Sequence, residues 1–315
     1  MQVLLVAPRY PTAKIRIIFQ SIPPVRQSVQ KKNYAICTNP NQIWTITRMQ
    51  QVRAKKALGQ HFLKDASIAQ QIAKSLVFTG RMPVLEIGPG MGILTQYLLQ
   101  NPDIDLTAIE LDKESVDFLS VNYPALHVIQ ADFLRFDLDI LYPEGQFCVI
   151  GNYPYNISSQ IFFKVLEYKD RIPCCSGMIQ KEVAERLASK PGNKAYGILS
   201  VLMQAYYDIE YLFTVHEHVF DPPPKVKSAV IRFVRNDRKK LDCNEQLFRQ
   251  IVKTAFNQRR KQMRNSLQQL VGKGNPVLQN PVFGKRPEQL TVEEFAALTN
   301  LIEKHGCAAA DAAHR

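Results

Sequence analysis

The sequence lacks the long apolar run that a membrane-spanning helix requires. No stretch of its 315 residues approaches the roughly 18 to 20 uninterrupted apolar residues of such a helix, and the mean hydropathy is -0.17. Glycine is scarce at 14 residues, while 46% of the chain is hydrophobic, which excludes a collagen-like repeat and chain-wide disorder. We therefore expect a soluble protein with no membrane partner. At ~100 to 200 residues per domain, the length predicts two domains.

Paired metal-binding cysteines are missing too. None of the six cysteines stands in a C-x-x-C pair, which argues against a structural zinc site and favours a reducing compartment, here taken as the cytoplasm. His216 and His218 flank Glu217 and would share one face of a strand, but no cysteine or further histidine lies nearby in the sequence to complete a site. The sequence thus predicts no bound metal.

Acidic residues are under-represented. The chain holds 28 Asp and Glu against 40 Lys and Arg, so its net charge is +12 and its pI is near 9.4. This surplus favours a polyanionic partner, with nucleic acid as the leading candidate. Seven of the basic residues lie within residues 1–48, and without these seven the surplus falls from +12 to +5.

The first 48 residues differ from the rest of the chain. Prolines interrupt their short apolar runs, and they contain no acidic residue and the only tryptophan, Trp44, so we expect this extension to be disordered. Three interpretations are open: a basic organellar transit peptide, a flexible RNA-contacting arm, or sequence translated upstream of a true start at Met49. We favour the last, because patterned sequence begins directly after Met49.

Residues 49–236 alternate between short apolar runs and helical segments, which is typical of a parallel sheet with helices on both faces. The predicted strands are Val84–Ile87, Leu106–Glu110, His127–Gln130, Phe147–Ile150, Gly177–Gln180 and Val226–Val234. A helix is expected over 66–77 with Asp65 as its N-cap, and further helices are expected between residue 180 and the last strand. Residues 237–315 begin with a charged linker and then read as almost wholly helical. The predicted fold class is α/β with a small helical C-terminal domain.

A glycine turn follows the first predicted strand. Gly88, Gly90 and Gly92 stand in G-x-G-x-G spacing before an apolar helix start, where glycine lets the backbone approach a ligand. Glu110 ends the next strand, where a carboxylate can accept hydrogen bonds from ribose hydroxyls. A dinucleotide site prefers a third glycine where this chain has Ile93, whereas S-adenosylmethionine has no pyrophosphate and needs only the shorter turn. The pattern favours S-adenosylmethionine over a nicotinamide cofactor, and also over a turn that only packs a helix on the sheet.

Polar residues also follow the third and fourth strands. The carboxylate of Asp132 can accept the exocyclic amine of the cofactor's adenine, or it can cap a helix. Residues 152–155 form the N-x-P-Y tetrad of enzymes that methylate exocyclic amines of bases. The Asn152 amide oxygen and a backbone carbonyl held by Pro154 can accept both N–H bonds of an adenine amine, which stabilises the positive charge that develops on methyl transfer. Tyr155 can stack on a base flipped out of its helix.

Taken in order, these motifs resemble the small-subunit ribosomal RNA adenine N6,N6-dimethyltransferases. The similarity covers roughly residues 53–305 and rests on segments 59–63 (GQHFL), 86–90 (EIGPG), 152–155 (NYPY) and 219–228 (VFDPPPKVKS). Two features depart from the family pattern: position 153 is Tyr where Leu is usual, and residues 1–48 have no counterpart in typical bacterial members. The first departure leaves the chemistry intact, because position 153 contributes a backbone carbonyl.

The resemblance implies a Rossmann-like methyltransferase sheet and assigns roles to individual residues. It places Asn152 between the cofactor and the target amine, and Phe220 against the target adenine on the face opposite Tyr155. The residues that it places around the cofactor are His61, Leu63, Gly88, Gly90, Glu110, Asp132 and Asn152.

A basic stretch in the second domain completes the candidate sites. Five cations lie close together in the sequence: Lys253, Arg259, Arg260, Lys261 and Arg264. Such a cluster is either an ordinary solvated helix face or a phosphate-binding surface. Because the same chain contains the tetrad of a base-modifying enzyme, we favour contact between this cluster and RNA.

The resemblance implies S-adenosylmethionine-dependent dimethylation of N6 of two adjacent adenosines in the 3′-terminal hairpin loop of 16S-type ribosomal RNA, during small-subunit biogenesis. Three alternatives stay open: a large-subunit ribosomal RNA methyltransferase of the macrolide-resistance type, a DNA adenine methyltransferase, and a non-catalytic RNA-binding assembly factor. We expect a monomer, because one active site can serve one RNA loop.

Overall fold

The computed structural model describes residues 52, 54–55 and 58–305. The chain divides into two compact units, residues 1–53 and 54–315, and the description below concerns the second. The predictions made for residues 1–48 lie outside the described residues. Within the described part, no helix is both long enough and apolar enough to cross a membrane.

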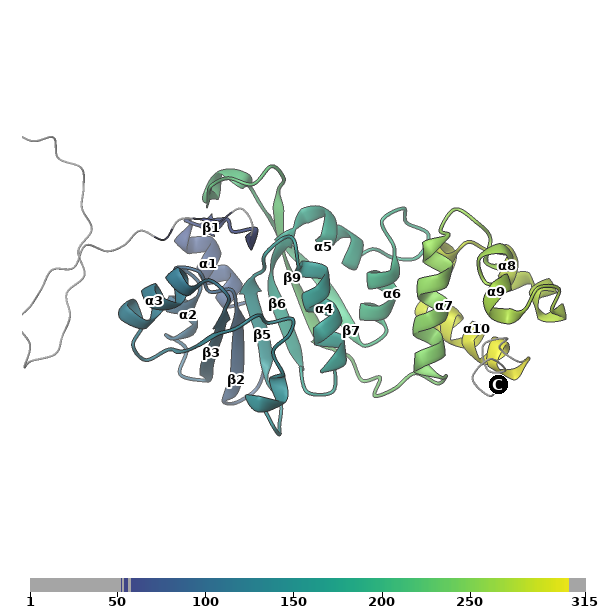
Figure 1. The fold of residues 1–315 in the computed structure, drawn as a ribbon, viewed down its shortest axis with the longest axis horizontal. Coiled ribbons are helices and arrows are strands. Elements are labelled where there is room, and N and C mark those ends of the chain that lie inside the picture. The colour runs from purple at the N-terminus through teal and green to yellow at the C-terminus, as the bar shows by residue number, and fades with distance from the viewer. Residues whose placement is uncertain (1–51, 53, 56–57, 306–315) are drawn as a thin grey trace, which may run out of the picture. The chain divides into compact units, whose positions relative to one another are not determined.

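A seven-stranded sheet of order β4-β3-β2-β5-β6-β9-β7 forms the centre of this unit (Figure 1). Its strands are β2 (Met82–Ile87), β3 (Ile104–Glu110), β4 (His127–Gln130), β5 (Cys148–Asn152), β6 (Cys174–Gln180), β7 (Tyr207–Val215) and β9 (Ser228–Arg235). The five strands from β4 to β6 run parallel, and β9 pairs antiparallel with both β6 and β7. Strands β5 and β6 are buried along nearly their whole length, as expected where both faces of a sheet are covered.

Helices cover the two faces of the sheet. Alternate residues of β2 belong to different clusters: Val84 packs with apolar residues of α1, α2 and α3, whereas Leu85 packs with those of α4 and α6. This alternation follows from the two-residue side-chain period of a strand. The helices are α1 (Ala66–Ala73), α2 (Thr95–Leu98), α3 (Lys113–Asn122), α4 (Ser158–Glu167), α5 (Lys181–Leu187) and α6 (Ile198–Gln204). The predicted N-cap of α1 is confirmed, since the Asp65 side chain accepts the N–H groups of Ser67 and Ile68.

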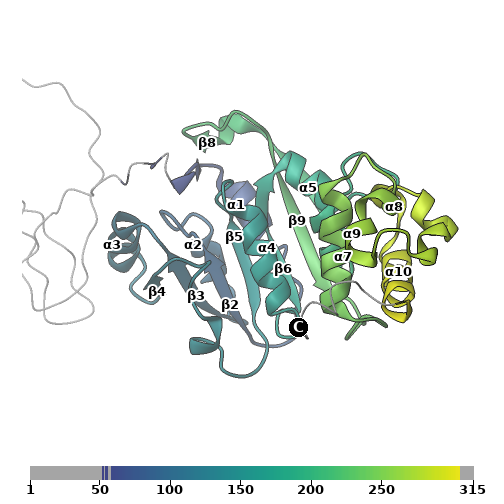
Figure 2. The ribbon, with the colours of Figure 1, turned by 45° about the vertical axis from the view of Figure 1, so that its right-hand side comes forward.

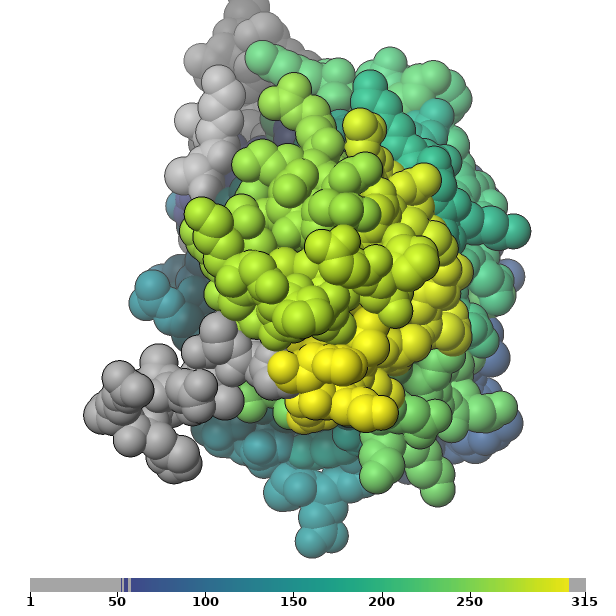
Figure 3. All heavy atoms as spheres, turned by 90° about the vertical axis from the view of Figure 1, so that its right-hand side faces the viewer, coloured from purple at the N-terminus to yellow at the C-terminus, as the bar shows by residue number. Residues whose placement is uncertain are grey.

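The C-terminal region is helical, as predicted, and packs against α6 (Figure 1). Figure 3 shows this region facing the viewer, in light green to yellow. It consists of α7 (Glu245–Asn257), α8 (Met263–Ser266), α9 (Gln268–Val271), α10 (Val292–Lys304) and the 3-10 helices η4 (Pro276–Gln279), η5 (Pro281–Gly284) and η6 (Pro287–Gln289). Each of these three 3-10 helices begins at a proline, a residue suited to a first helical position because no partner is needed for its missing N–H. The buried residues of this region belong to the same cluster as one face of the sheet. The predicted boundary at 236/237 falls between β9 and α7 and stays a prediction.

Strand β7 is the main correction to the predicted elements. We predicted only helices between residue 180 and the last strand, but residues 207–215 form an edge strand paired with β9. The two histidines considered as ligands do not lie in a strand either, since Glu217 and His218 belong to the 3-10 helix η3 (Glu217–Val219). No group of three or more potential metal ligands occurs among the described residues.

Two glycines face each other near the end of β5. Gly151 pairs with Gly177 of β6, and a Cβ on Gly177 would lie 2.3 Å from the Gly151 carbonyl oxygen and 2.5 Å from the Tyr153 ring. Tyr153 is 1% exposed, and its hydroxyl donates to the Ser176 carbonyl oxygen at 2.7 Å. The unusual tyrosine thus fills the space beside the two glycines and fixes the chain just after β5, where the tetrad begins.

Candidate active site

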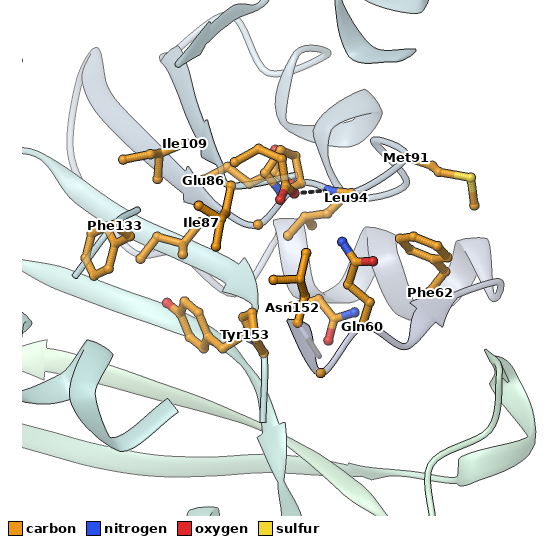
Figure 4. A pocket seen from close by; sticks show the side chains of 18 of the residues that line it. Gln60, Phe62, Glu86, Ile87, Met91, Leu94, Ile109, Phe133, Asn152 and Tyr153 are labelled. Atoms are coloured by element: carbon orange, nitrogen blue, oxygen red, sulfur yellow. Dashed lines mark hydrogen bonds between the residues drawn. The ribbon is translucent and has the colours of Figure 1, made fainter. Parts of the chain in front are cut away.

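A cavity of about 570 Å³ lies at the sheet edge where the parallel strands end. It is lined by residues that follow β2, β3, β4 and β5 and by residues 58–64. Figure 4 shows Asn152 and Gln60 reaching into this cavity from two different segments, while the Tyr153 ring is directed elsewhere. This is the edge at which open α/β sheets bind ligands.

The turn after β2 brings a backbone donor to the Glu110 carboxylate. Gly88 and Gly90 have φ values of 66° and 57°, a region that favours glycine. The Gly90 N–H donates to Glu110 Oε2 at 3.1 Å, and the Asp112 N–H donates to Oε1 at 2.9 Å. A carboxylate has about four acceptor positions, so positions remain for two ribose hydroxyls. Burial raises the pKa of Glu110, and the backbone donors oppose that rise.

Glu86, inside β2, is a second buried carboxyl beside the cavity. It is 1% exposed, and Thr95 Oγ1 donates to its Oε2 at 2.7 Å. Burial raises its pKa to about 8, an effect that the Thr95 hydroxyl opposes and the nearby Glu110 carboxylate increases. Glu86 is therefore largely protonated at neutral pH, and Glu110 is the carboxylate that is placed to bind a ribose.

Asp132 lines the cavity after β4. Its Oδ1 accepts the Leu134 N–H at 2.9 Å, but residues 133–135 form a turn and not a helix, so the carboxylate does not cap a helix. Its Oδ2 lies 3.5 Å from Arg135 Nε. The hydrogen bond to Leu134 holds the carboxylate at the cavity, and its contact with the cofactor's adenine stays a prediction.

The Asn152 side chain is oriented by the backbone of the segment before β1. Its Nδ2 donates to the His61 carbonyl oxygen at 3.3 Å. In the part of the chain that the structure describes, no group donates to Asn152 Oδ1, so this acceptor remains for a ligand. The Tyr153 N–H donates to the Met178 carbonyl oxygen at 3.0 Å, which fixes the orientation of the neighbouring peptide.

Tyr155 is held at both ends of its ring. Its hydroxyl is hydrogen-bonded to Ser228 Oγ at the start of β9, and its ring lies 5.4 Å from the His61 ring at an interplanar angle of 31°. His61 Nδ1 is in turn 2.8 Å from the Pro222 carbonyl oxygen. The tyrosine ring is therefore a fixed platform at the cavity wall, as stacking on a base requires.

Phe220 lies in a different environment from the one that the resemblance implies. It forms part of the short strand β8 (Phe220–Asp221), which pairs with β1 (Phe62–Leu63). Its side chain is 1% exposed, packs in the cluster of Leu63 and Val230, and is not among the residues that line the cavity. Contact between Phe220 and a target base stays a prediction, and it would require the β8 segment to move.

Residues 58–64 form a strap across the cavity, and every one of them lines it. The C-terminal end of the strap is fixed by the β1–β8 pairing and by the Lys64 N–H, which donates to the Val219 carbonyl oxygen at 2.8 Å. Its N-terminal end is fixed by Lys55, whose ammonium lies 2.5 Å from Asp112 Oδ1 and 3.1 Å from Glu114 Oε1. His61 and Leu63 both belong to the strap, so the structure places these two predicted residues over the cavity.

The five predicted RNA-contacting cations are distributed over α7, the following turn and α8. Four of them are exposed: Lys253, Arg260, Lys261 and Arg264. Arg259 is half-buried and donates through Nη2 to the carbonyl oxygens of Lys194, at 2.6 Å, and Asn193, at 3.4 Å. Lys253 Nζ lies over the Phe163 ring, 6.0 Å from its centroid. The stretch therefore contains one half-buried arginine with a structural task and four exposed cations.

Some residues of the site were not predicted from the sequence. Gln60 lines the cavity directly before His61, and its Oε1 accepts the Lys55 N–H at 2.9 Å. The motif 59–63 already pointed to this segment. Lys55 and Ser228 act through partners far away in the sequence, and no local pattern indicates such contacts.

The cavity suits S-adenosylmethionine. Glu110 offers acceptor capacity for the ribose, and Asp132 offers a carboxylate at the neighbouring strand end. Most of the remaining lining is apolar, as an adenine ring and a methylthio group require.

We predict that Glu86→Gln reduces the loss of folding stability that occurs as pH rises from 5 to 8. A group whose pKa is raised by folding stabilises the fold below its ordinary pKa, and this contribution is lost as pH rises towards the folded value of about 8. Glutamine stays neutral and can still accept the Thr95 hydroxyl. Between pH 5 and 8 the free energy of unfolding of the variant should gain on the wild type by up to ~1.4 kcal/mol per pH unit, measured by urea denaturation. Glu144→Gln, at an exposed carboxyl, controls for net charge, and equal pH profiles for the Glu86 variant and the wild type would refute the prediction.

A second prediction concerns the N-terminal end of the strap. Lys55→Met should raise the dissociation rate of S-adenosylmethionine roughly two- to fivefold, because the ion pairs of Lys55 hold the N-terminal end of the strap and an exposed ion pair contributes only modestly. Stopped-flow measurement with cofactor alone tests this. Lys113→Met is the matched control, since Lys113 pairs with Asp117 on the neighbouring helix and not with the strap. Equal dissociation rates for the two variants would show that Lys55 does not hold the strap.

Sequence comparisons agree with this geometry. The profile of the ribosomal RNA adenine dimethylase family matches residues 51–304. A protein of Parabacteroides distasonis named ribosomal RNA small subunit methyltransferase A is 66% identical over 259 residues, which are 82% of this chain and 97% of that protein. A protein of the same name from Phocaeicola vulgatus is 60% identical, over 80% of this chain and 90% of that protein.

Solved structures show the same fold. A dimethyladenosine transferase from Plasmodium falciparum superimposes with a TM-score of 0.66 at 22% identity, over 78% of this chain and 99% of that one. The 23S rRNA methyltransferase ErmE gives a TM-score of 0.58 at 25% identity, over 77% of this chain and 99% of that one. The predicted methyltransferase fold and its S-adenosylmethionine cofactor are thereby confirmed. Because the family profile covers residues 51–304 and relatives of 66% and 60% identity cover four fifths of it, the chain belongs to the ribosomal RNA adenine dimethylase family.

Proposed function

We propose that this enzyme transfers two methyl groups from S-adenosylmethionine to N6 of each of two adjacent adenosines in the 3′-terminal hairpin loop of small-subunit ribosomal RNA. The observation that carries the proposal is the orientation of the Asn152 amide at the end of β5. Its NH₂ group is engaged by His61, and its oxygen is free in the cavity. An amide held in this way is an acceptor for an exocyclic amine.

The residues of the chain perform three tasks in the reaction. When bound, the cofactor supplies an electrophilic methyl group on its sulfonium. The Asn152 oxygen and the Tyr153 carbonyl oxygen accept the two N–H bonds of adenine N6, which localises the nitrogen lone pair and stabilises the developing positive charge. Tyr155, fixed by Ser228, provides the surface on which the flipped base stacks.

Small-subunit RNA is the substrate that the comparisons favour. Relatives at 66% and 60% identity carry small-subunit names, whereas the large-subunit enzyme ErmE shares 25% identity with this chain. The exposed cations Lys253, Arg260, Lys261 and Arg264 supply sequence-independent contacts to phosphates. The binding partner is then the small ribosomal subunit during its assembly, which places the enzyme in the cytoplasm.

One cavity serves one RNA loop, so we infer a monomer, with a solution mass near 36 kDa that does not vary with concentration.

A transfer assay tests the substrate assignment. The enzyme is incubated with labelled S-adenosylmethionine and, separately, with unmethylated small subunits, large-subunit RNA and duplex DNA, and the labelled nucleosides are identified. We expect dimethyladenosine from small subunits alone. Label confined to large-subunit RNA would assign the resistance-type activity instead, and cofactor binding without any labelled nucleic acid would indicate a non-catalytic RNA-binding factor.

The mechanism predicts that removal of the Asn152 amide impairs methyl transfer much more than it impairs cofactor binding. Asn152→Ala should lower kcat on small subunits by about 10²- to 10³-fold, since it removes one preorganised acceptor of the transition state. Its dissociation constant for S-adenosylmethionine, measured by calorimetry, should change only a few-fold. Full transfer by a variant that still binds cofactor would disprove the role of this amide.

A further inference from the structure

The connection between α5 and α6 is a basic loop that projects towards the helical region. Residues 190–194 (KPGNK) contain two lysines and no acidic residue, and Lys190, Gly192, Asn193 and Lys194 are all exposed. Figure 1 shows this connection at the same end of the molecule as the turn between α7 and α8, and Figure 2 shows the two lying close together from a second angle. We call residues 190–194 the bridging loop.

The bridging loop is held in one conformation by its own hydrogen bonds. The Asn193 N–H donates to the Lys190 carbonyl oxygen at 3.3 Å, and the Tyr196 N–H donates to the Asn193 carbonyl oxygen at 3.1 Å. Asn193 Oδ1 accepts the Ala195 N–H at 2.8 Å. Behind the loop, Tyr196 is fully buried with its ring 6.2 Å from that of Phe256 in α7. The two lysines are thus presented from an ordered turn.

Two contacts attach the bridging loop to the helical region. The Gly192 N–H donates to the carbonyl oxygen of Glu288 in η6 at 2.6 Å. Arg259, from the turn after α7, donates to the carbonyl oxygens of Lys194 and Asn193. Its guanidinium also lies 6.0 Å from the Phe256 ring. Arg259 therefore joins the catalytic part of the chain to the predicted RNA-contacting stretch.

The charges on both sides of this junction are unpaired. Within the described residues, no carboxylate lies within ion-pair distance of Lys190 or Lys194, nor of Arg260 or Lys261 beside Arg259. Exposed surface charges of a protein are usually compensated by neighbours of opposite sign. Four cations without an ion-pair partner therefore lie on two segments that are joined by the hydrogen bonds of Arg259, and this arrangement suits the phosphates of one RNA strand.

We infer that the bridging loop is a phosphate-binding part of the RNA interface, with Lys190 and Lys194 as its ligands, and that Arg259 is a positioning residue that acts through this loop. The inference rests on the proposed RNA substrate and deepens it. Arg260 and Lys261 keep the direct phosphate contact that the sequence predicted for the whole stretch. The loop extends their surface towards the sheet, to which it is connected through α5. This helix begins at the end of β6, where the Lys181 N–H donates to the carbonyl oxygen of Lys227, the residue before Ser228.

Steady-state kinetics on unmethylated small subunits test the two lysines. The double variant Lys190→Ala/Lys194→Ala should raise KM for subunits roughly five- to tenfold at unchanged kcat and unchanged affinity for S-adenosylmethionine. The slope of log affinity against log salt concentration should fall by about one per lysine. Lys239→Ala/Lys240→Ala is the matched control, because it removes two exposed lysines from the linker between β9 and α7. The same KM for this control and for the loop variant would overturn the inference.

A double-mutant cycle tests Arg259. Arg259→Ala should also raise KM, and adding the two loop substitutions should raise it little further, since the arginine acts through the loop. Arg259→Lys should recover part of the affinity, because an ammonium can still donate to the Lys194 carbonyl oxygen. Full additivity of the two sets of substitutions would make Arg259 an independent RNA ligand and refute its positioning role. Thermal denaturation of each variant separates these effects from unfolding.

These outcomes are distinct from failure of the proposed function. If the wild-type enzyme labelled no small subunits, the substrate assignment would be wrong. If the wild type labelled them and the loop variants matched the control, only the inference about the bridging loop would be wrong.

Discussion

The parallel pairing of β2 with β5 is the constraint on which the active site depends. The two strands are neighbours in the sheet although some sixty residues separate them, and their register sets Val84 beside Cys148 and Glu86 beside Ile150. The glycine turn that we expect to hold the cofactor follows β2, and Asn152 ends β5. A register shift of one residue would turn the buried side chains of β5 to the opposite faces of the sheet. Burial of apolar residues on both faces therefore also fixes how far the glycine turn lies from the Asn152 amide.

Much of this arrangement could be predicted from the sequence because it depends on local patterns. Continuous apolar runs marked the central strands, and each polar residue directly after such a run had to lie at the same edge of the sheet. Strand β7 was not predicted because it is an edge strand. Exposed residues such as Asp208 and Glu210 interrupt its apolar pattern, and its pairing is determined by β9. The same limit applies to the ion pair of Lys55 with Asp112 and to the hydrogen bond of Tyr155 with Ser228. These contacts join distant segments, and they become apparent only when the chain is folded.

The two aromatic residues expected around the target base differ in how they are placed. Tyr155 is ready to receive a base, since its hydroxyl is anchored at the start of β9 and its ring lines the cavity. Phe220 is buried in the pairing of β8 with the strap. The structure is therefore complete on the cofactor side and on one face of the base site. The other face depends on a segment that is tied to the strap.

The strap has a consequence for the order of events over many turnovers. Two methyl groups on each of two adenosines require a fresh cofactor for every transfer, and the strap lines the cavity in which we expect the cofactor to bind. Since β1 of the strap pairs with β8, a movement of the strap that admits a new cofactor also disturbs the segment of Phe220. Exchange of cofactor and the placement of Phe220 are therefore mechanically coupled through one pair of short strands.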